Sequence, residues 1–182
     1  AQDSHLELPR LPHGLERLRS LELVPFKAAI DAGVATIMTA HVVFEALDPD
    51  VPATMSAKAI DGLLRGELGY DGCVISDDLE MKAVRGRFEM SEVVERALNA
   101  GVDAFLACKE LELQHEVVGQ IVRAVESGRV PLERVAQAAE RVERVVQRFA
   151  SRADAVDPDA AERFAGTEAH QAVAARVLPA VA

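Results

Sequence analysis

Cysteine is scarce in this sequence, and the classes of site that depend on it are missing. The two cysteines, Cys73 and Cys108, each lie inside an apolar segment and show no metal-ligand spacing. No His/Cys metal cluster, glycine-rich phosphate loop or Walker motif occurs in the chain. We therefore expect two reduced thiols in the core, in a reducing compartment, and neither a metal ion nor an organic cofactor.

Positive charge and long apolar runs are also in short supply. Lysine and arginine total 20 against 30 for aspartate and glutamate, which gives a formal net charge of −10. This balance opposes binding to a phosphate backbone, so nucleic acid is not an expected partner. No apolar run reaches the ~20 residues that a membrane-spanning helix needs, and no basic segment followed by an apolar core opens the chain. We expect no membrane partner, and nothing in the sequence supports export.

Hydrophobic residues make up 49% of the chain, enough for a substantial core in one globular unit. Short apolar segments typical of buried strands alternate with segments of helical spacing. The expected strands cover residues 34–40, 73–76 and 102–108, and the expected helices cover residues 15–32 with a break at Pro25, 57–68, 92–100 and 111–127. The tripeptide Ala-Gly-Val introduces both the first and the third strand. This alternation predicts a parallel sheet, which is either doubly wound or closed as a (β/α)8 barrel.

The pattern changes after Pro131. Apolar residues then step by three and four, on one stripe of a helix: Leu132, Val135, Ala139, Val142, Val146 and Phe149. We expect this stripe to pack against the sheet, and a seam for a partner helix is the alternative. We therefore divide the chain into residues 1–150, which hold the sheet, and residues 151–182, a polar linker and a last helix that packs on the first part.

Two adjacent aspartates, Asp77 and Asp78, follow the second expected strand directly. Burying a carboxylate costs several kcal/mol unless it is paired or hydrogen-bonded, and loops at the carboxyl ends of parallel strands often carry functional sites. A structural interpretation competes with the functional one: Asp78 caps the next turn, and Asp77 is solvated. His41 ends the first strand in a similar position, where a hydrogen-bonded structural histidine fits equally well.

The tripeptide Asp3-Ser4-His5 is a further candidate. Residues two apart in an extended or turning segment can bring a carboxylate to an imidazole nitrogen, which fixes the tautomer and raises the basicity of the other nitrogen. Polar residues near a terminus are also commonly just solvated. The tripeptide alone therefore does not decide between a catalytic and a solvated role.

Four segments in order carry a family resemblance: "DSHLELPRL", "ELVPFKAAIDAGVATIMTAHV", "ALDPDVPATMS" and "LLRGELGYDGCVISDDLEMKAV". They resemble the bacterial β-N-acetylhexosaminidases of glycoside hydrolase family 3, cytoplasmic enzymes of cell-wall recycling. The resemblance implies the carboxyl-terminal part of a (β/α)8 TIM barrel, whose missing amino-terminal part would be a necessary partner. It also implies removal of terminal β-linked N-acetylglucosamine from a glycoside or muropeptide, with retention of configuration.

The same resemblance assigns roles to individual residues. Asp77 matches the nucleophile, His5 the general acid/base, and Asp3 the carboxylate that orients His5. Asp78 and Met81 match the motif that supports the nucleophile loop and sugar pocket, and His41 is a further candidate contact to substrate. No metal or organic cofactor is implied.

Two alternatives to hydrolysis stay open. A phosphorylase would use the same nucleophile and histidine with phosphate in place of water, and a non-catalytic half-barrel would serve as a binding module. Glu45 departs from the family pattern, because related sequences often carry proline there, which leaves the conformation of this loop open. We expect the chain to be inactive without the upstream strands.

Overall fold

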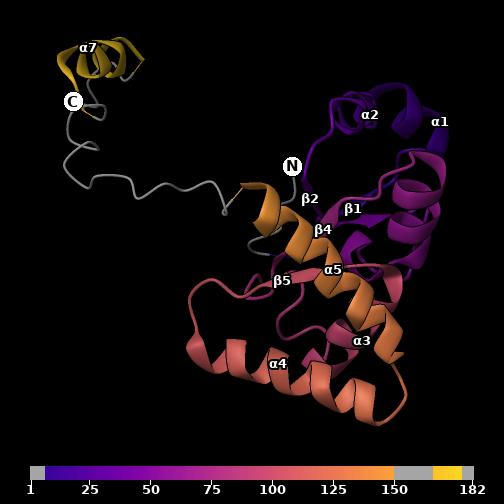
Figure 1. Ribbon diagram of the computed structural model, residues 1–182. Coiled ribbons are helices and arrows are strands. Elements are labelled where there is room, and N and C mark those ends of the chain that lie inside the picture. The colour runs from indigo at the N-terminus through magenta and orange to yellow at the C-terminus, as the bar shows by residue number, and fades with distance from the viewer. Residues whose placement is uncertain (1–6, 150–165, 178–182) are drawn as a thin grey trace. The chain divides into compact units, whose positions relative to one another are not determined.

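The computed structural model describes residues 7–149 and 166–177. The chain divides into two compact units, residues 1–146 and 147–182, and each is described by itself. The first unit holds all the strands of the described residues (Figure 1). Asp3, His5 and Pro179 lie outside the described residues, and the predicted division after residue 150 stays a prediction.

The main sheet has three parallel strands in the order β2-β4-β5. These strands are β2 (Thr36–Met38), β4 (Cys73–Asp78) and β5 (Ala104–Leu106). The prediction of a parallel sheet is confirmed. Gly33 and Gly101, which precede β2 and β5, have φ of 78° and 113°, a left-handed conformation that favours glycine. The repeated Ala-Gly-Val tripeptide thus marks two helix ends of the same kind.

Helical segments alternate with these strands, as the spacing of apolar residues predicts. They are α1 (Leu15–Arg17), the π-helical η1 (Leu18–Glu22), α2 (Val24–Asp31), the 3-10 turn η2 (Ala53–Met55), the π-helical η3 (Lys58–Glu67), α3 (Met90–Ala100), α4 (Leu111–Glu126) and α5 (Leu132–Phe149). Pro25 lies in the first turn of α2, where a missing N–H costs nothing. The second unit contains α7 (Glu168–Val177). Within the described ranges, every helix is too short or too polar to cross a membrane.

A second, small sheet is not predicted from the sequence. It pairs β1 (Arg10–Leu11) in parallel with β3 (Val43–Phe44). The N–H of Val43 donates to the carbonyl of Pro9 at 2.9 Å, and the N–H of Glu45 donates to that of Leu11 at 3.1 Å. Backbone hydrogen bonds therefore hold the segment that begins at Pro9 against the residues that follow β2.

Two apolar clusters form the core of the first unit. One joins β2, β4 and η3 through residues such as Ile37, Ile60 and Val74. The other joins α3 and α4 to the chain just after β4, where Leu79 and Val84 are fully buried. The residues that follow Asp78 thus turn directly into the core, which anchors the end of β4.

The predicted packing of α5 is confirmed only in part, because Val135 of the predicted stripe packs against the core cluster while other members of the stripe do not. Leu132, Val146 and Phe149 of the predicted stripe are 64%, 53% and 57% exposed. The side of α5 that docks carries Arg134, Ala138 and Arg141, and these two arginines reach the buried carboxylate of Asp103 at 2.6 and 3.4 Å. A buried carboxylate requires charged partners, so these ion pairs, together with the apolar contact of Val135, set the rotation of the helix.

One prediction about the cysteines is also wrong. Cys73 is a buried thiol at the start of β4, as expected, whereas Cys108 is exposed on the loop that follows β5. β5 ends at Leu106, two residues before the end of the apolar run, so Cys108 lies on the loop at the carboxyl end of the sheet and outside the core.

Candidate active site

Asp77 and Asp78 are the last two residues of β4, the central strand of the main sheet. Both side chains are half-buried. The backbone N–H of Asp78 donates to Oδ1 of Asp77 at 2.9 Å, which holds that carboxylate at the strand end. A carboxylate so placed has the position expected of a catalytic group in a parallel α/β fold.

Asp78 connects the two loops that leave the sheet. Its Oδ1 atom accepts the N–H of Glu80 at 3.2 Å, a turn of the kind that the structural interpretation of this residue predicts. The same oxygen accepts the N–H of Cys108, on the loop after β5, at 3.4 Å. Met81, on the same loop, is 8% exposed, and its role in supporting this loop and the sugar pocket stays a prediction.

His41 is completely buried beside these aspartates. Its Nδ1 atom lies 2.9 Å from Oγ1 of Thr54, and its Nε2 atom lies 3.1 Å from the backbone carbonyl oxygen of Asp78. Burial lowers the pKa of His41 below its usual value, against the opposing effect of the nearby Asp77 carboxylate. Both ring nitrogens are engaged by the protein, and contact of His41 with a substrate stays a prediction.

The rim at the carboxyl ends of β4 and β5 is rich in carboxylates. Glu80 and Glu110 lie beside the aspartates, and Arg85 pairs with both carboxylate oxygens of Glu110 at 2.6 and 2.7 Å. No group of three potential metal ligands is assembled within the described ranges. The arrangement offers carboxylates that can act as a nucleophile or as a base.

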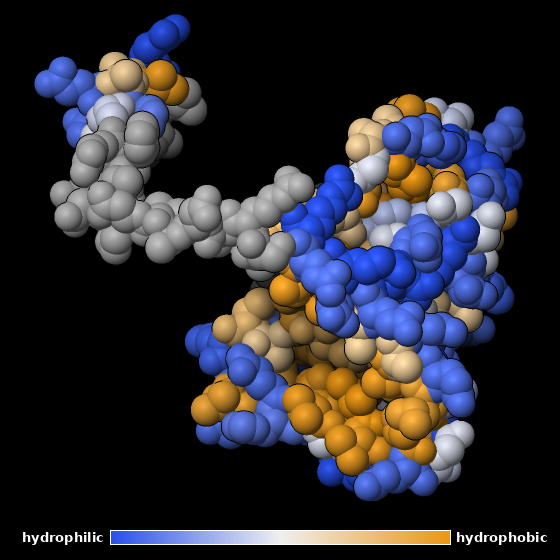
Figure 2. All heavy atoms as spheres, viewed as in Figure 1, coloured by the Kyte–Doolittle hydropathy of each residue, from blue (hydrophilic) through white to orange (hydrophobic). Residues whose placement is uncertain are grey.

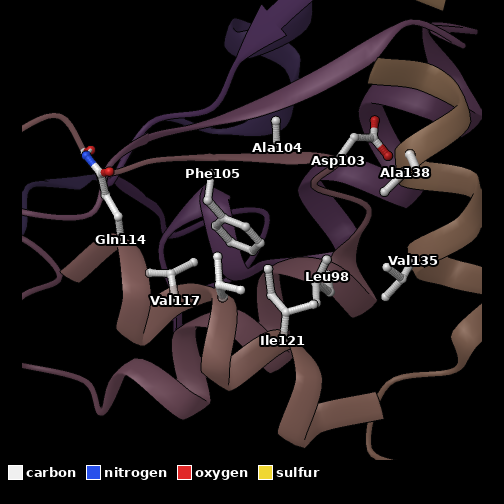
Figure 3. Close-up of a pocket in the computed structure, with 12 residues that line it drawn as sticks. Leu98, Asp103, Ala104, Phe105, Gln114, Val117, Ile121, Val135 and Ala138 are labelled. Atoms are coloured by element: carbon white, nitrogen blue, oxygen red, sulfur yellow. Dashed lines mark hydrogen bonds between the residues drawn. The ribbon is translucent and has the colours of Figure 1, made fainter. Parts of the chain in front are cut away.

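A separate groove of about 440 Å³ lies between β5, α4 and α5, and its lining shares no residue with the aspartate rim. Figure 3 shows Phe105 pointing from β5 toward Val117 and Ile121 of α4, with Val135 of α5 at the other side. Apolar side chains gather over α4 in Figure 2, and Val118 and Val122 are 60% and 50% exposed. The carboxylate of Asp103 also lines this groove, but it is engaged by Arg65 at 2.7 Å and by Arg134 at 2.6 Å.

The profile of the glycosyl hydrolase family 3 N-terminal domain matches residues 1–145. The chain belongs to this family. It is 45% identical over 112 residues to a β-hexosaminidase of Alkalilimnicola ehrlichii, which covers 62% of this chain and 32% of that protein. A β-hexosaminidase of Nitrosomonas eutropha is 37% identical over 116 residues, 64% of this chain and 33% of the relative.

Solved structures agree with this assignment. The family 3 β-N-acetylglucosaminidase of Paenibacillus sp. str. FPU-7 superposes with a TM-score of 0.82 at 45% identity, over 86% of this chain and 30% of that one. The β-glucoside phosphorylase BglX has a TM-score of 0.83 at 20% identity over 97% of this chain and 33% of that one, which shows the fold alone. The family 3 chain thus has the predicted fold, part of a (β/α)8 barrel followed by helices, and it spans about a third of the length of these relatives.

Sequence reasoning missed Glu80 as a member of the rim. Its carboxylate accepts backbone N–H groups from the loop after β5, at a separation of about thirty residues along the chain. The motif "SDDLEM" contains this residue, but nothing in its spacing shows which distant backbone it reaches.

Proposed function

We propose that this chain supplies the nucleophile side of a retaining β-N-acetylhexosaminidase site. The observation that carries the proposal is the place of Asp77 at the carboxyl end of the central parallel strand, with its carboxylate held by the N–H of Asp78. Membership of glycosyl hydrolase family 3 and the named activities of its relatives support the choice of sugar. Its substrate is a glycoside that ends in β-linked N-acetylglucosamine, muropeptides included, and its setting is cell-wall recycling in the cytoplasm.

The proposed reaction has two displacements at one carbon. The Asp77 carboxylate attacks the anomeric carbon while protonated His5 gives its proton to the departing glycosidic oxygen, and a covalent glycosyl-enzyme forms. Neutral His5 then takes a proton from water, whose oxygen attacks the same carbon and releases Asp77. The two inversions restore the original configuration, and Asp3 stabilises the imidazolium form of His5, which is present before the first displacement and again after the second.

The pairing of β1 with β3 supports the participation of His5. Pro9 is held by the N–H of Val43 at 2.9 Å, and Val43 follows His41 by two residues. Four residues of extended chain span at most about 14 Å, so His5 stays within that distance of the anchor. An unperturbed imidazole has a pKa of about 6.5, which suits a group that both gives and takes a proton near neutrality.

The open edges of the main sheet support the proposal that activity requires further strands. Among the described residues, β2 and β5 each pair with β4 only, so both of their outer edges are open. Met38, on β2, is 52% exposed, and the apolar groove lies beside β5. A barrel closes only when the outer strands are paired. We propose that turnover requires the remaining strands of the barrel, and that the chain without them is inactive.

The test is a substitution of the nucleophile in the full-length protein. Asp77→Ala lowers the turnover of a chromogenic β-N-acetylglucosaminide by about 10⁴-fold or more, because it removes the group that forms the intermediate. Asp71→Ala, at a side chain that is 81% exposed, serves as the matched control and leaves turnover unchanged. A slow fluorinated substrate should add its sugar mass to the peptide that contains Asp77.

Two results contradict the proposal. One is turnover by Asp77→Ala that equals the wild-type rate, as a non-catalytic half-barrel predicts. The other is a product that appears as sugar 1-phosphate only when phosphate is added, which would replace hydrolysis by phosphorolysis.

A further inference from the structure

One side chain joins the two loops at the carboxyl rim of the sheet. Glu80 lies on the loop after β4, and its Oε1 atom accepts the N–H groups of Lys109 and Glu110, on the loop after β5, both at 2.7 Å. Hydrogen bonds to an ionised acceptor are shorter and roughly twice as strong as neutral ones. Two such bonds to one oxygen make Glu80 a clamp between the loops.

Glu80 is linked to the proposed nucleophile through two hydrogen bonds. The N–H of Glu80 donates to Oδ1 of Asp78 at 3.2 Å, and the N–H of Asp78 donates to Oδ1 of Asp77 at 2.9 Å. The same Asp78 oxygen accepts the N–H of Cys108 at 3.4 Å, next to the residues that Glu80 holds. Both loops therefore converge on the residue that orients the Asp77 carboxylate.

The backbone ladder alone leaves this region poorly held. The pairing of β4 with β5 is irregular between Ile75 and Asp78, and its last pair joins Asp78 to Leu106. Beyond that pair only the N–H of Leu79, which donates to Leu106, continues the backbone contact between the strands. Side-chain bonds must hold the loops from there on.

A second link between the loops is weaker. Arg85, on the first loop, pairs with Glu110, on the second, but the two side chains are 46% and 42% exposed. Exposed ion pairs contribute little because water and salt screen them. Glu80 also lies at the amino end of α4, which begins after Glu110, and the helix dipole favours a carboxylate there.

We propose that Glu80 is a positioning residue for the glycosidase reaction, which acts by fixing the loop after β5 against Asp78 and thereby the Asp77 carboxylate. This inference rests on the proposed function. Misplacement of a reacting group by about 1 Å costs on the order of a hundredfold in rate. Loss of the clamp therefore acts on the chemical step, while the sugar still binds.

The experiment compares four forms of the full-length protein: wild type, Glu80→Ala, Glu80→Gln and Glu112→Ala. Glu80→Ala lowers kcat by about tenfold to a hundredfold and changes KM less than about threefold. Glu80→Gln keeps an acceptor oxygen for both N–H groups and restores kcat to near the wild-type value. Glu112→Ala removes an exposed acid in the first turn of α4 and leaves both constants unchanged.

Amide hydrogen exchange separates positioning from general stability. The amides of Lys109 and Glu110 exchange faster in Glu80→Ala than in wild type and Glu80→Gln, while core amides such as Val74 keep their protection. If Glu80→Ala does not fold, Glu80→Asp takes its place, because it retains the charge but is one methylene too short to reach both amides.

The outcomes distinguish the two hypotheses. A wild-type protein without glycosidase activity refutes the proposed function, whatever the exchange rates show. An active wild type with an equally active Glu80→Ala variant refutes the positioning role alone. A Glu80→Gln variant as slow as Glu80→Ala also refutes it, because the acceptor geometry would then not be what the reaction requires.

Discussion

Nε2 of His41 donates a hydrogen bond to the backbone carbonyl oxygen of Asp78, across the ends of two neighbouring strands. A carbonyl oxygen can only accept, so the proton of the neutral ring is on Nε2 and Nδ1 accepts from Thr54. Thr54 in turn lies 2.9 Å from the hydroxyl of Thr39. A largely buried chain of two hydroxyls and an imidazole thus fixes the peptide bond that follows Asp78.

This hydrogen-bonded chain predicts a pH dependence of stability. The pKa of His41 is lowered in the folded state by burial, whereas the unfolded chain titrates near 6.5. The unfolded state therefore binds more protons below that value, and the free energy of unfolding falls as the pH drops through 6.5 toward the folded-state pKa. Above pH 7 the His41 contribution is constant.

His41→Gln tests this expectation, because glutamine does not titrate. The variant loses about 1–3 kcal/mol at pH 7, since Thr54 and the Asp78 carbonyl lose well-placed partners. Its stability changes less than that of wild type between pH 7 and 5. Urea unfolding across this range measures both quantities, and an unchanged pH slope in the variant would remove His41 as the source.

Asp103 predicts a large and local effect on stability. Its fully buried carboxylate accepts from Arg65 at 2.7 Å and from Arg134 at 2.6 Å, and also from the N–H of Val74 at 2.9 Å. Asp103→Asn leaves buried guanidinium groups without their counter-charge and costs about 3–5 kcal/mol. Urea unfolding at pH 7 provides the measurement.

The control for that variant is Asp71→Asn. Asp71 pairs with Arg141 at 3.3 Å, but its side chain is 81% exposed, so the loss is below about 1 kcal/mol. Equal losses in the two variants would show that the burial of Asp103 carries no special cost.

The alkylation rate of the Cys108 thiol depends on the charge of Asp78. Desolvation by its surroundings raises the pKa of this thiol, and the negative charge of Asp78 raises it further. The thiolate is the reactive form, so iodoacetamide alkylates Cys108 slowly at neutral pH. Asp78→Asn removes the charge and accelerates alkylation, which peptide mass spectrometry follows over time.

The buried Cys73 is the internal control for this measurement, because it stays unmodified in the folded protein. An alkylation rate of Cys108 that is the same in wild type and in the Asp78→Asn variant would mean that the carboxylate does not act on the thiol.

Glu45 anchors the segment that leads back toward His5. Its N–H donates to Leu11 at 3.1 Å, and its carboxylate accepts from Arg10 at 2.9 Å. Glu45→Pro removes both bonds, so the amide of Val43, which donates to Pro9, exchanges faster with solvent. Glu45→Gln keeps the N–H and leaves this exchange near the wild-type rate. Equal exchange in the two variants would show that the backbone bond does not hold the segment.

The sequence predicts the main sheet because each strand has a local signal. Short apolar runs between glycine and polar residues mark β2, β4 and β5, and these fix the position of Asp77. The pair β1 and β3 has two residues in each strand, too few to show a period of two. Its existence depends on contacts across more than thirty residues of chain, which no local pattern encodes.

The contacts of Glu80 and the docking of α5 escaped prediction for a related reason. In both, one charged side chain meets a partner distant in sequence: Glu80 meets backbone amides, and Arg134 meets Asp103. The apolar stripe of α5 predicts a helix correctly but only part of the side that packs, because Val135 contacts the core whereas Leu132 and Val146 are exposed. A buried charge elsewhere in the fold contributes to the choice of that side, and periodicity of apolar residues contains no information about it.

The two ends of β5 are secured by opposite chemistries. Before the strand, two arginine guanidinium groups form ion pairs with the carboxylate of Asp103. After the strand, the carboxylates of Asp78 and Glu80 accept hydrogen bonds from backbone N–H groups. Residues that determine thermal stability and residues that determine the reactivity of Asp77 therefore lie at opposite ends of the same strand. Substitutions of the arginines of α5 therefore change the stability of the fold without touching the residues that surround Asp77.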